Sequence, residues 1–175
     1  MKTNNSGHAR KAIQLVLAAG MAVGASQQAL AGNIFLSIPG IPGESVDDKH
    51  KDQIDIESFS QSLERGDCQL TFSKRVDKAS PHLADAASSR KPIPSATLVV
   101  RRTGFKDQSE EYLKLTMSYV TVVSSEMWVS DEAAQEDITV NARSILIGLK
   151  PQSQDGKLGT EVIKNILCNT AGGRR

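Results

Sequence analysis

Apolar and polar residues alternate over most of the chain, and this pattern predicts strands. In the segment 53–61, Ile54 and Ile56 alternate with Asp55 and Glu57, so one face of a strand is buried and the other is solvated. Further strands are predicted between turn residues at 33–38, a short apolar run rich in β-forming residues, at 95–102, which alternates poorly, and at 69–76, 112–125 and 137–152. The segment 160–170 fits either a strand or a helix. About seven or eight regularly punctuated strands are typical of an all-β sandwich or closed barrel.

The alternation also predicts the core. The side chains expected there are Phe35, Ile54, Ile56, Leu70, Phe72, Leu98, Val100, Leu115, Val140 and Ile147. Two strands depart from strict alternation. Three consecutive apolar residues, Leu98–Val100, predict burial on both faces near the middle of their strand. In the segment 137–152 the apolar parity changes across Arg143–Ser144, which predicts a β-bulge or bend within one long strand.

One short segment has helical character instead. Ser80 is a favourable N-cap, and Pro81 stands where proline suits the first helical position. Leu83 and Ala87 are four residues apart and share a face. A helix of this length is unstable alone. We therefore expect Ser80–Ser88 to pack against the strands, either closing an open end of the barrel or covering its flank.

The first 31 of the 175 residues have the order of a secretory signal peptide. Three basic residues and no acidic one precede the apolar run Ala12–Val23, and Ala29–Ala31 supplies an A-x-A pattern, so we expect cleavage between Ala31 and Gly32. The apolar run is shorter than the roughly 20 residues that a membrane-spanning helix needs. A membrane anchor or an amphipathic first helix is the alternative. The expected divisions are a signal peptide at 1–31, one domain at 32–170 and a flexible tail at 171–175, in a secreted or periplasmic protein.

Composition excludes several kinds of partner. Without the signal peptide the chain has 18 basic and 20 acidic residues, and aromatic residues make up 4% of the whole sequence. This balance predicts no nucleic-acid partner and, after signal removal, no membrane partner. The larger aromatic side chains are expected in the core or at an interface: Tyr112, Tyr119 and Trp128.

Two cysteines, Cys68 and Cys168, both lie in the exported part of the chain. In an oxidising compartment such a pair is a candidate disulfide. Two buried free thiols are the alternative, because cysteine is often buried without a bridge. Their spacing fits no zinc-binding pattern.

No arrangement of residues predicts catalysis. The histidines His50 and His82 have no metal-ligand spacing, and we expect His50 to be solvated or locally hydrogen-bonded and His82 to lie on the surface. Asp47 and Asp48 suggest a cation loop, but the glycine and distal glutamate of a calcium loop are missing. The sequence has no G-x-S-x-G, C-x-x-C or P-loop motif. We therefore expect no catalytic residue, no metal site and no cofactor.

Several motifs, taken in order, resemble one known family. The segment FLSIPGIPGESVDDKHKDQIDIESF is similar to the opening of the Hcp family, the haemolysin-coregulated tube proteins of type VI secretion systems. LTFSKRVDKASPHL resembles the strand of that family that leads into its one helix. Three later strands match in the same order: PIPSATLVVRRTG, EEYLKLTMSYVTVVS and ITVNARSILIGLKPQ. The resemblance covers Asn33 to about Asn169.

The resemblance implies a β-barrel of two packed antiparallel sheets with one short flanking α-helix. It also implies six-membered rings of identical protomers that stack into a secreted tube, carry small protein effectors and contact other type VI secretion components without catalysis. The chain departs from the family in its signal peptide and in the short segment 62–68, where the family has a long loop that helps rings contact one another. Whether the rings stack is left open.

Two other functions remain open on the sequence alone. The first is a Sec-exported, Hcp-like binding module that acts in the periplasm or outside the cell without a tube. The second is a small-ligand barrel or an enzyme on a β-scaffold. The mass of the exported protein separates a ring of about six protomers from a module of one or two.

Overall fold

The computed structural model describes residues 33–64, 66–103, 109–130 and 133–168. The signal peptide at 1–31, its cleavage between Ala31 and Gly32, and the tail at 171–175 lie outside the described residues. The elements, in chain order, are β1 (Ile34–Ser37), β2 (Ile54–Asp55), β3 (Ser58–Glu64), β4 (Asp67–Arg75), α1 (Ser80–Ser89), β5 (Ile93–Thr103), β6 (Ser109–Val129), β7 (Ala134–Asn141), β8 (Ser144–Leu149) and β9 (Val162–Leu167). The segment 160–170, open between strand and helix, contributes strand β9.

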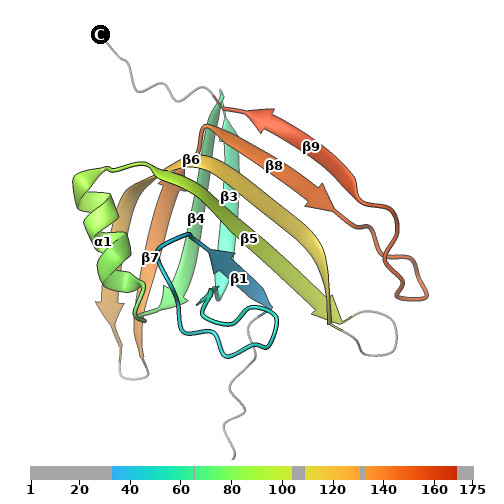
Figure 1. Ribbon diagram of the computed structural model, residues 1–175, viewed down its shortest axis with the longest axis horizontal. Helices are drawn as coiled ribbons and strands as arrows, with labels where there is room; N and C mark the ends of the chain where they lie inside the picture. The colour runs from blue at the N-terminus through green and yellow to red at the C-terminus, as the bar shows by residue number, and fades with distance from the viewer. Residues whose placement is uncertain (1–32, 65, 104–108, 131–132, 169–175) are drawn as a thin grey trace, which may run out of the picture.

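Two antiparallel sheets share the long strand β6 (Figure 1). The first sheet has the order β2-β1-β5-β6-β8-β9 and uses the first half of β6. The second has the order β6-β7-β4-β3 and uses the second half. The expected antiparallel sheets and single helix are confirmed. Among the described strands the hydrogen-bonded path ends at β2, β3 and β9, so the sheets do not join into one continuous closed ladder.

Strand β6 changes sheets between Ser118 and Thr121, and within this segment Tyr119 has a left-handed φ of 50°. Ser118 pairs with Ser144 in the first sheet, and Thr121 pairs with Asn141 in the second. A non-glycine residue rarely adopts a positive φ, and here it lets the strand turn the corner between the sheets.

The segment 137–152 corrects the expectation of one bulged strand. It forms two strands, β7 in the second sheet and β8 in the first, joined by Ala142–Arg143. The backbone N–H of Arg143 donates to the carbonyl of Ser118 at 3.0 Å, so this link follows the bend in β6. The parity change at Arg143–Ser144 therefore marks a corner between two sheets.

The core lies between the sheets and beneath α1, and it contains most of the predicted side chains. Those in the buried cluster are Ile54, Ile56, Leu70, Phe72, Leu98, Val100, Leu115 and Val140. Ile147 is only partly buried at its margin.

Phe35 is fully buried but faces the opposite side of the first sheet, where it stacks on His50. The predicted burial of Phe35 is confirmed, but a loop that covers the outer face buries it, and it lies outside the cluster between the sheets. Burial of all three residues Leu98–Val100 is confirmed.

Helix α1 packs Leu83 and Ala86 against the strands and ends at Arg90, which has a φ of 52°. The N-cap position belongs to Ala79, so the prediction for Ser80 was wrong by one residue. Ser80 is the first helical residue, and its hydroxyl bonds into the strands rather than capping the helix.

The hairpin between β3 and β4 is tighter than the turn predicted around 62–68. Leu63 pairs with Cys68 and Glu64 with Asp67, so the strand pairing extends as far as Glu64 and Asp67. Gly66 has a φ of 88°, a conformation that glycine adopts at little cost. The longer loop that the family resemblance would place here is replaced by this short turn.

Candidate functional site: surfaces and anchors

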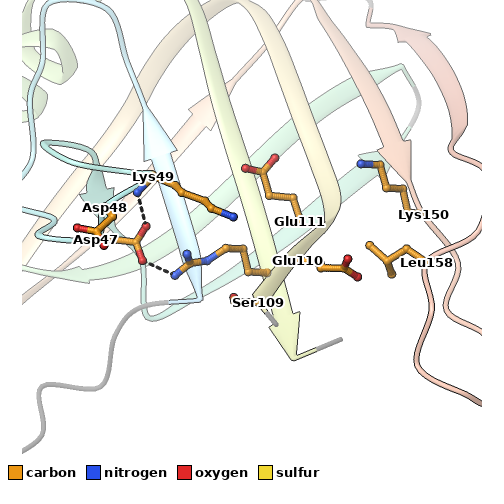
Figure 2. Close-up of a pocket in the computed structure, with 9 residues that line it drawn as sticks. Asp47, Asp48, Lys49, Ser109, Glu110, Glu111, Lys150 and Leu158 are labelled. Carbon is orange, nitrogen blue, oxygen red and sulfur yellow. Dashed lines mark hydrogen bonds and ion pairs between the residues drawn. The ribbon is translucent and has the colours of Figure 1, made fainter. Parts of the chain in front are cut away.

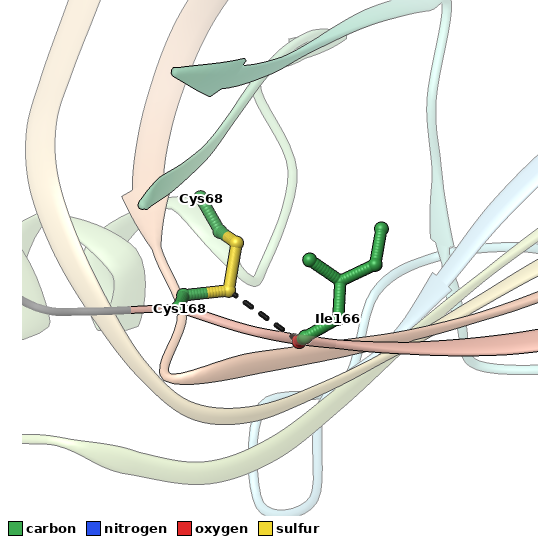
Figure 3. The surroundings of a disulfide bond; sticks show 3 residues. All are labelled: Cys68, Ile166 and Cys168. Atoms are coloured by element: carbon green, nitrogen blue, oxygen red, sulfur yellow. Dashed lines mark hydrogen bonds between the residues drawn. A yellow bond between two sulfur atoms is a disulfide. The ribbon is translucent and has the colours of Figure 1, made fainter. Parts of the chain in front are cut away.

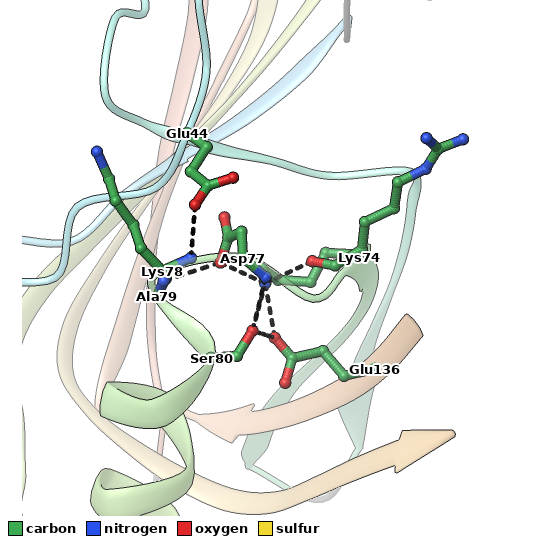
Figure 4. Close-up of polar contacts among 8 residues, drawn as sticks. Glu44, Lys74, Asp77, Lys78, Ala79, Ser80 and Glu136 are labelled. Carbon is green, nitrogen blue, oxygen red and sulfur yellow. Dashed lines mark hydrogen bonds and ion pairs between the residues drawn. The ribbon is translucent and has the colours of Figure 1, made fainter. Parts of the chain in front are cut away.

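A buried polar anchor fixes the start of α1 to the second sheet (Figure 4). The Lys74 side chain is completely buried. Its Nζ donates to Glu136 Oε1 at 2.6 Å, Asp77 Oδ1 at 2.7 Å, the Arg75 carbonyl at 2.7 Å and Ser80 Oγ at 3.1 Å. The Ser80 hydroxyl donates to Glu136 Oε1 at 2.6 Å. Strands β4 and β7 and the helix therefore meet at one ammonium group.

This anchor has nucleophile, base and acid side chains in contact, but its burial argues for a structural role. Ser80 is 1% exposed and Glu136 is 0% exposed, so a substrate cannot reach either oxygen. The Ser80 hydroxyl also accepts from the backbone N–H of Asp77 at 3.0 Å. A buried charge needs a partner and further hydrogen bonds, and this cluster supplies them to Lys74 and to Glu136 Oε1, while Glu136 Oε2 has no hydrogen-bond partner among the described residues.

Sequence reasoning missed the anchor, although a signal was present. Lys74 stands two residues after Phe72, and Glu136 stands two residues before Ile138. Since residues two apart in a strand share a face, both charged side chains point to the core side of the sheet. The two residues are register partners across β4 and β7. Opposite charges at core-facing positions of two neighbouring strands indicate a buried ion pair.

A second cluster fastens the loop between β1 and β2 to the outer face of the first sheet. The His50 ring stacks on Phe35 with centroids 4.1 Å apart, and the Arg101 guanidinium lies 4.5 Å from the Phe35 centroid. Arg101 also pairs with Asp47 at 2.7 Å. His50 is 4% exposed, and its Nδ1 lies 3.2 Å from Gln53 Oε1. The local hydrogen bond expected for His50 is therefore present, whereas His82 is exposed as predicted.

The electrostatics of this loop centre on Asp47. Partial burial raises the pKa of Asp47. The hydrogen bond and charge of Arg101 and the backbone N–H groups of Lys49 and His50 lower that pKa by a larger amount. The net result is a pKa below the ordinary value of 3.8. The ionised carboxylate thus stabilises the docked loop.

An open groove of about 670 Å³ lies beside this loop (Figure 2). Its lining residues are Asp47, Asp48, Lys49, Arg101, Ser109, Glu110, Glu111, Lys150 and Leu158. Acidic and basic side chains are mixed, and Leu158 is the one apolar residue among those that line the groove. No described group of three or more His, Cys, Asp or Glu side chains is arranged to hold a metal ion. The groove suits contact with a polar protein surface better than capture of a small molecule.

A disulfide joins Cys68, the second residue of strand β4, to Cys168, directly after β9 (Figure 3). The two Cα atoms are 5.6 Å apart, within the range that a bridge allows. The cysteines flank the link between β7 and β8. The Cys68 carbonyl accepts from Ala142 N–H at 3.0 Å, and Cys168 N–H donates to the Arg143 carbonyl at 2.8 Å.

Exposed apolar side chains gather on the last two strands of the first sheet. The β8–β9 patch consists of Leu146, Leu149, Val162, Ile163 and Leu167, which are between 40% and 78% exposed. Directly opposite residues of paired strands share a face. Leu149 and its partner Val162 face the core side, whereas Ile163 and Leu167 face the outer side. Apolar side chains are therefore exposed on both faces of this part of the sheet.

Two of the aromatic residues expected in the core or at an interface are exposed in the single chain. Tyr119 is 56% exposed and Trp128 is 40% exposed, next to the exposed Met127 and Val129 near the end of β6. Tyr112 is partly buried against the core.

The outer face of the second sheet is polar. Hydroxyl and amide side chains line it in register across β3, β4 and β7: Ser58, Ser60, Ser62, Gln69, Thr71, Ser73, Thr139 and Asn141. Thr71 Oγ1 lies 3.1 Å from Thr139 Oγ1, and Ser73 donates to Asp137. We call this surface the polar sheet face.

Among the residues that the structure describes, no helix has the length and apolarity to cross a bilayer.

Comparison with known proteins assigns the chain to a family. Residues 35–147 match the family model described as "Type VI secretion system effector, Hcp". Protein hcp1 of Pseudomonas aeruginosa is 30% identical over 144 residues, which cover 73% of this chain and 88% of the relative. The crystal structure of Hcp1 from Salmonella typhimurium superposes with a TM-score of 0.67 at 32% identity, covering 75% of this chain and 91% of that one. A type VI secretion system effector from Yersinia pestis, 24% identical, has the same fold, with a TM-score of 0.65 over 77% of this chain and 98% of that one. The chain therefore belongs to the Hcp family of type VI secretion proteins.

Proposed function

We propose that this protein is a non-catalytic, self-assembling component that forms rings of six protomers for a type VI secretion tube. The number six comes from the family resemblance. The observation that carries self-assembly is the β8–β9 patch. The proposed lumen of the ring carries small protein effectors, and the other partners are further type VI secretion components.

The β8–β9 patch supports the proposal because an uncovered apolar sheet edge is a liability for a secreted monomer. Val162, Ile163 and Leu167 are each more than half exposed, and β9 pairs with β8 alone among the described strands. Large contiguous apolar surfaces on soluble proteins usually mark an interface, and open strand edges promote uncontrolled pairing. A neighbouring protomer in a closed ring covers both features.

The polar sheet face supports the proposed lumen. Its hydroxyl and amide groups can hydrogen-bond to water and to the surfaces of passing proteins, and Asp137 adds a carboxylate to the same face. A polar sheet face suits the wall of a water-filled channel, whereas the apolar β8–β9 patch suits contact between protomers.

The signal peptide and the short hairpin distinguish this chain within the proposal. We expect export through the Sec route to the periplasm or beyond, where the Cys68–Cys168 bond is stable. The short hairpin between β3 and β4 has few residues that could contact another ring. The single ring is therefore the proposed unit of assembly.

The proposal is tested by light scattering on the protein recovered after export from a Sec-competent host. We expect a mass of about six protomers. The double variant Ile163→Lys and Leu167→Lys should lower that mass to one or two protomers, because buried unpaired lysines are costly at an interface. Val46→Lys is the matched control, since Val46 is 91% exposed on a loop far from the patch in sequence.

A monomeric or dimeric unaltered protein would instead favour an exported binding module. A mass that is the same for the double variant and the Val46 control would remove the β8–β9 patch from the assembly surface.

A further inference from the structure

We propose that the Cys68–Cys168 disulfide is a latch for β9, closed by oxidation during export, which completes the β8–β9 patch only outside the reducing cytoplasm. The effect on assembly rests on the proposed function, whereas the effect on β9 does not.

Strand β9 depends on few contacts of its own. It is an edge strand that pairs with β8 alone among the described strands. Every side chain of β9 except Ile166 is exposed, and Ile166 is partly buried against the core cluster. Segments with few buried contacts open locally at low cost. Yet β9 supplies three of the five residues of the patch.

The disulfide ties this weakly held strand to the other sheet. Cys168 follows β9 directly in the first sheet, and Cys68 lies in β4 of the second, 100 residues away. Both cysteines also hydrogen-bond through their backbones to the link Ala142–Arg143. The covalent bond thus spans the corner at which the two sheets separate.

Sulfur contacts at this corner change with oxidation state. Cys168 Sγ lies 3.6 Å from the Ile166 carbonyl oxygen (Figure 3). A disulfide sulfur has no proton to donate, so this is a packing contact in the oxidised protein. The reduced thiol gains a weak donor that reaches an atom of β9 itself, and it loses the covalent connection to β4.

Closing the latch is a two-electron oxidation. The thiols of Cys68 and Cys168 together lose two protons and two electrons and form one S–S bond. The oxidant is a disulfide of the exporting compartment, carried by a thiol–disulfide oxidoreductase, which becomes a dithiol through a mixed-disulfide intermediate. Cys68 is 3% exposed and Cys168 is 8% exposed in the closed form. Thiol–disulfide exchange at these sulfur atoms therefore requires β9 to separate from the rest of the fold. The same burial protects the finished bond from reductants.

Backbone hydrogen exchange tests the latch on the full chain, expressed in an export-competent host and recovered in oxidised form. The comparison is with the Cys68→Ala, Cys168→Ala double variant and with unaltered protein reduced and alkylated while partly unfolded, then refolded. The readout is the ratio of exchange rates of β9 amides to those of β4 and β7 amides. We expect this ratio to rise by at least about tenfold when the bond is absent.

An unchanged ratio, or one that falls because all strands lose protection together, would overturn the latch and make the bond a general staple. Light scattering on the same samples separates the two proposals. If the ratio rises but no sample forms rings, the latch stands and ring assembly fails. If the ratio is constant and all samples form rings, ring assembly stands and the latch fails.

Discussion

At the scale of single residues, Lys74 shows what holds this fold together beyond apolar packing. Its ammonium group contacts Glu136, Asp77 and Ser80 in a site without solvent. Attraction between such charges offsets their desolvation only when every partner is present. The anchor is therefore a point at which one substitution affects two strands and the helix.

Replacing Lys74 with alanine should cost about 3–5 kcal/mol of unfolding free energy, because Glu136 is left buried without its counter-charge. Chemical denaturation measures this loss. Lys78→Ala is the control, since Lys78 is 44% exposed and pairs with the exposed Asp52, and such a pair contributes about 0–1 kcal/mol. Equal losses for the two variants would contradict a buried structural anchor.

The Asp47–Arg101 pair gives stability a defined dependence on pH. The pKa of Asp47 is lowered below 3.8 in the folded protein, so folding favours its ionised form. This contribution is fully present above pH 3.8 and is lost as the pH falls through the lowered folded value. We expect urea unfolding to show less acid destabilisation below pH 3.8 in Asp47→Asn than in the unaltered protein. Parallel stability curves for the two proteins in acid would contradict the assignment.

At the scale of elements, much of the fold follows from period-two alternation. Ile54, Leu70, Phe72 and Val140 were predicted in the core because they alternate with polar neighbours, and each is less than 5% exposed. Alternation tells which residues share a face. It does not tell what covers the other face.

Phe35 shows the limit of that reasoning. It was predicted in the core from alternation towards one face, and it is buried, but it shares its face with its register partner Val99, outside the cluster between the sheets. The loop carrying His50 then buries it. Because the covering residues belong to a loop elsewhere in the sequence, the pattern of the strand itself does not show that this face is buried.

The corner at Arg143–Ser144 shows a second limit. A parity change arises equally from a bulge in one strand and from a passage between two sheets. Only the pairing of β6 with both β7 and β8 distinguishes them. Close to this change of partner Tyr119 has a left-handed φ of 50°, a conformation that local propensity would not assign to a tyrosine.

The disulfide belongs to the same scale because it connects elements of different sheets. In the chain-entropy model, a bridge that closes a loop of 100 residues adds about 4–5 kcal/mol. We expect the Cys68→Ala, Cys168→Ala variant to lose an amount of this order in chemical denaturation. A loss below about 1 kcal/mol would show that the bond barely constrains the unfolded chain.

At the scale of the whole molecule, two surfaces differ in chemistry and belong to different strands. The apolar β8–β9 patch lies on the strands that extend the first sheet beyond α1 and the second sheet (Figure 1). The polar sheet face lies on β3, β4 and β7. A closed ring needs one surface for its neighbours and another for its lumen, and this protomer has both.

The central claim is that protomers meet through the β8–β9 patch and turn the polar sheet face inward. Electron cryo-microscopy of the oxidised, exported protein tests it most directly. We expect six-fold rings in which Ile163 and Leu167 are buried between protomers and Ser60 and Thr71 line the lumen. Single protomers, or rings in which Ile163 and Leu167 remain in solvent, would contradict the claim.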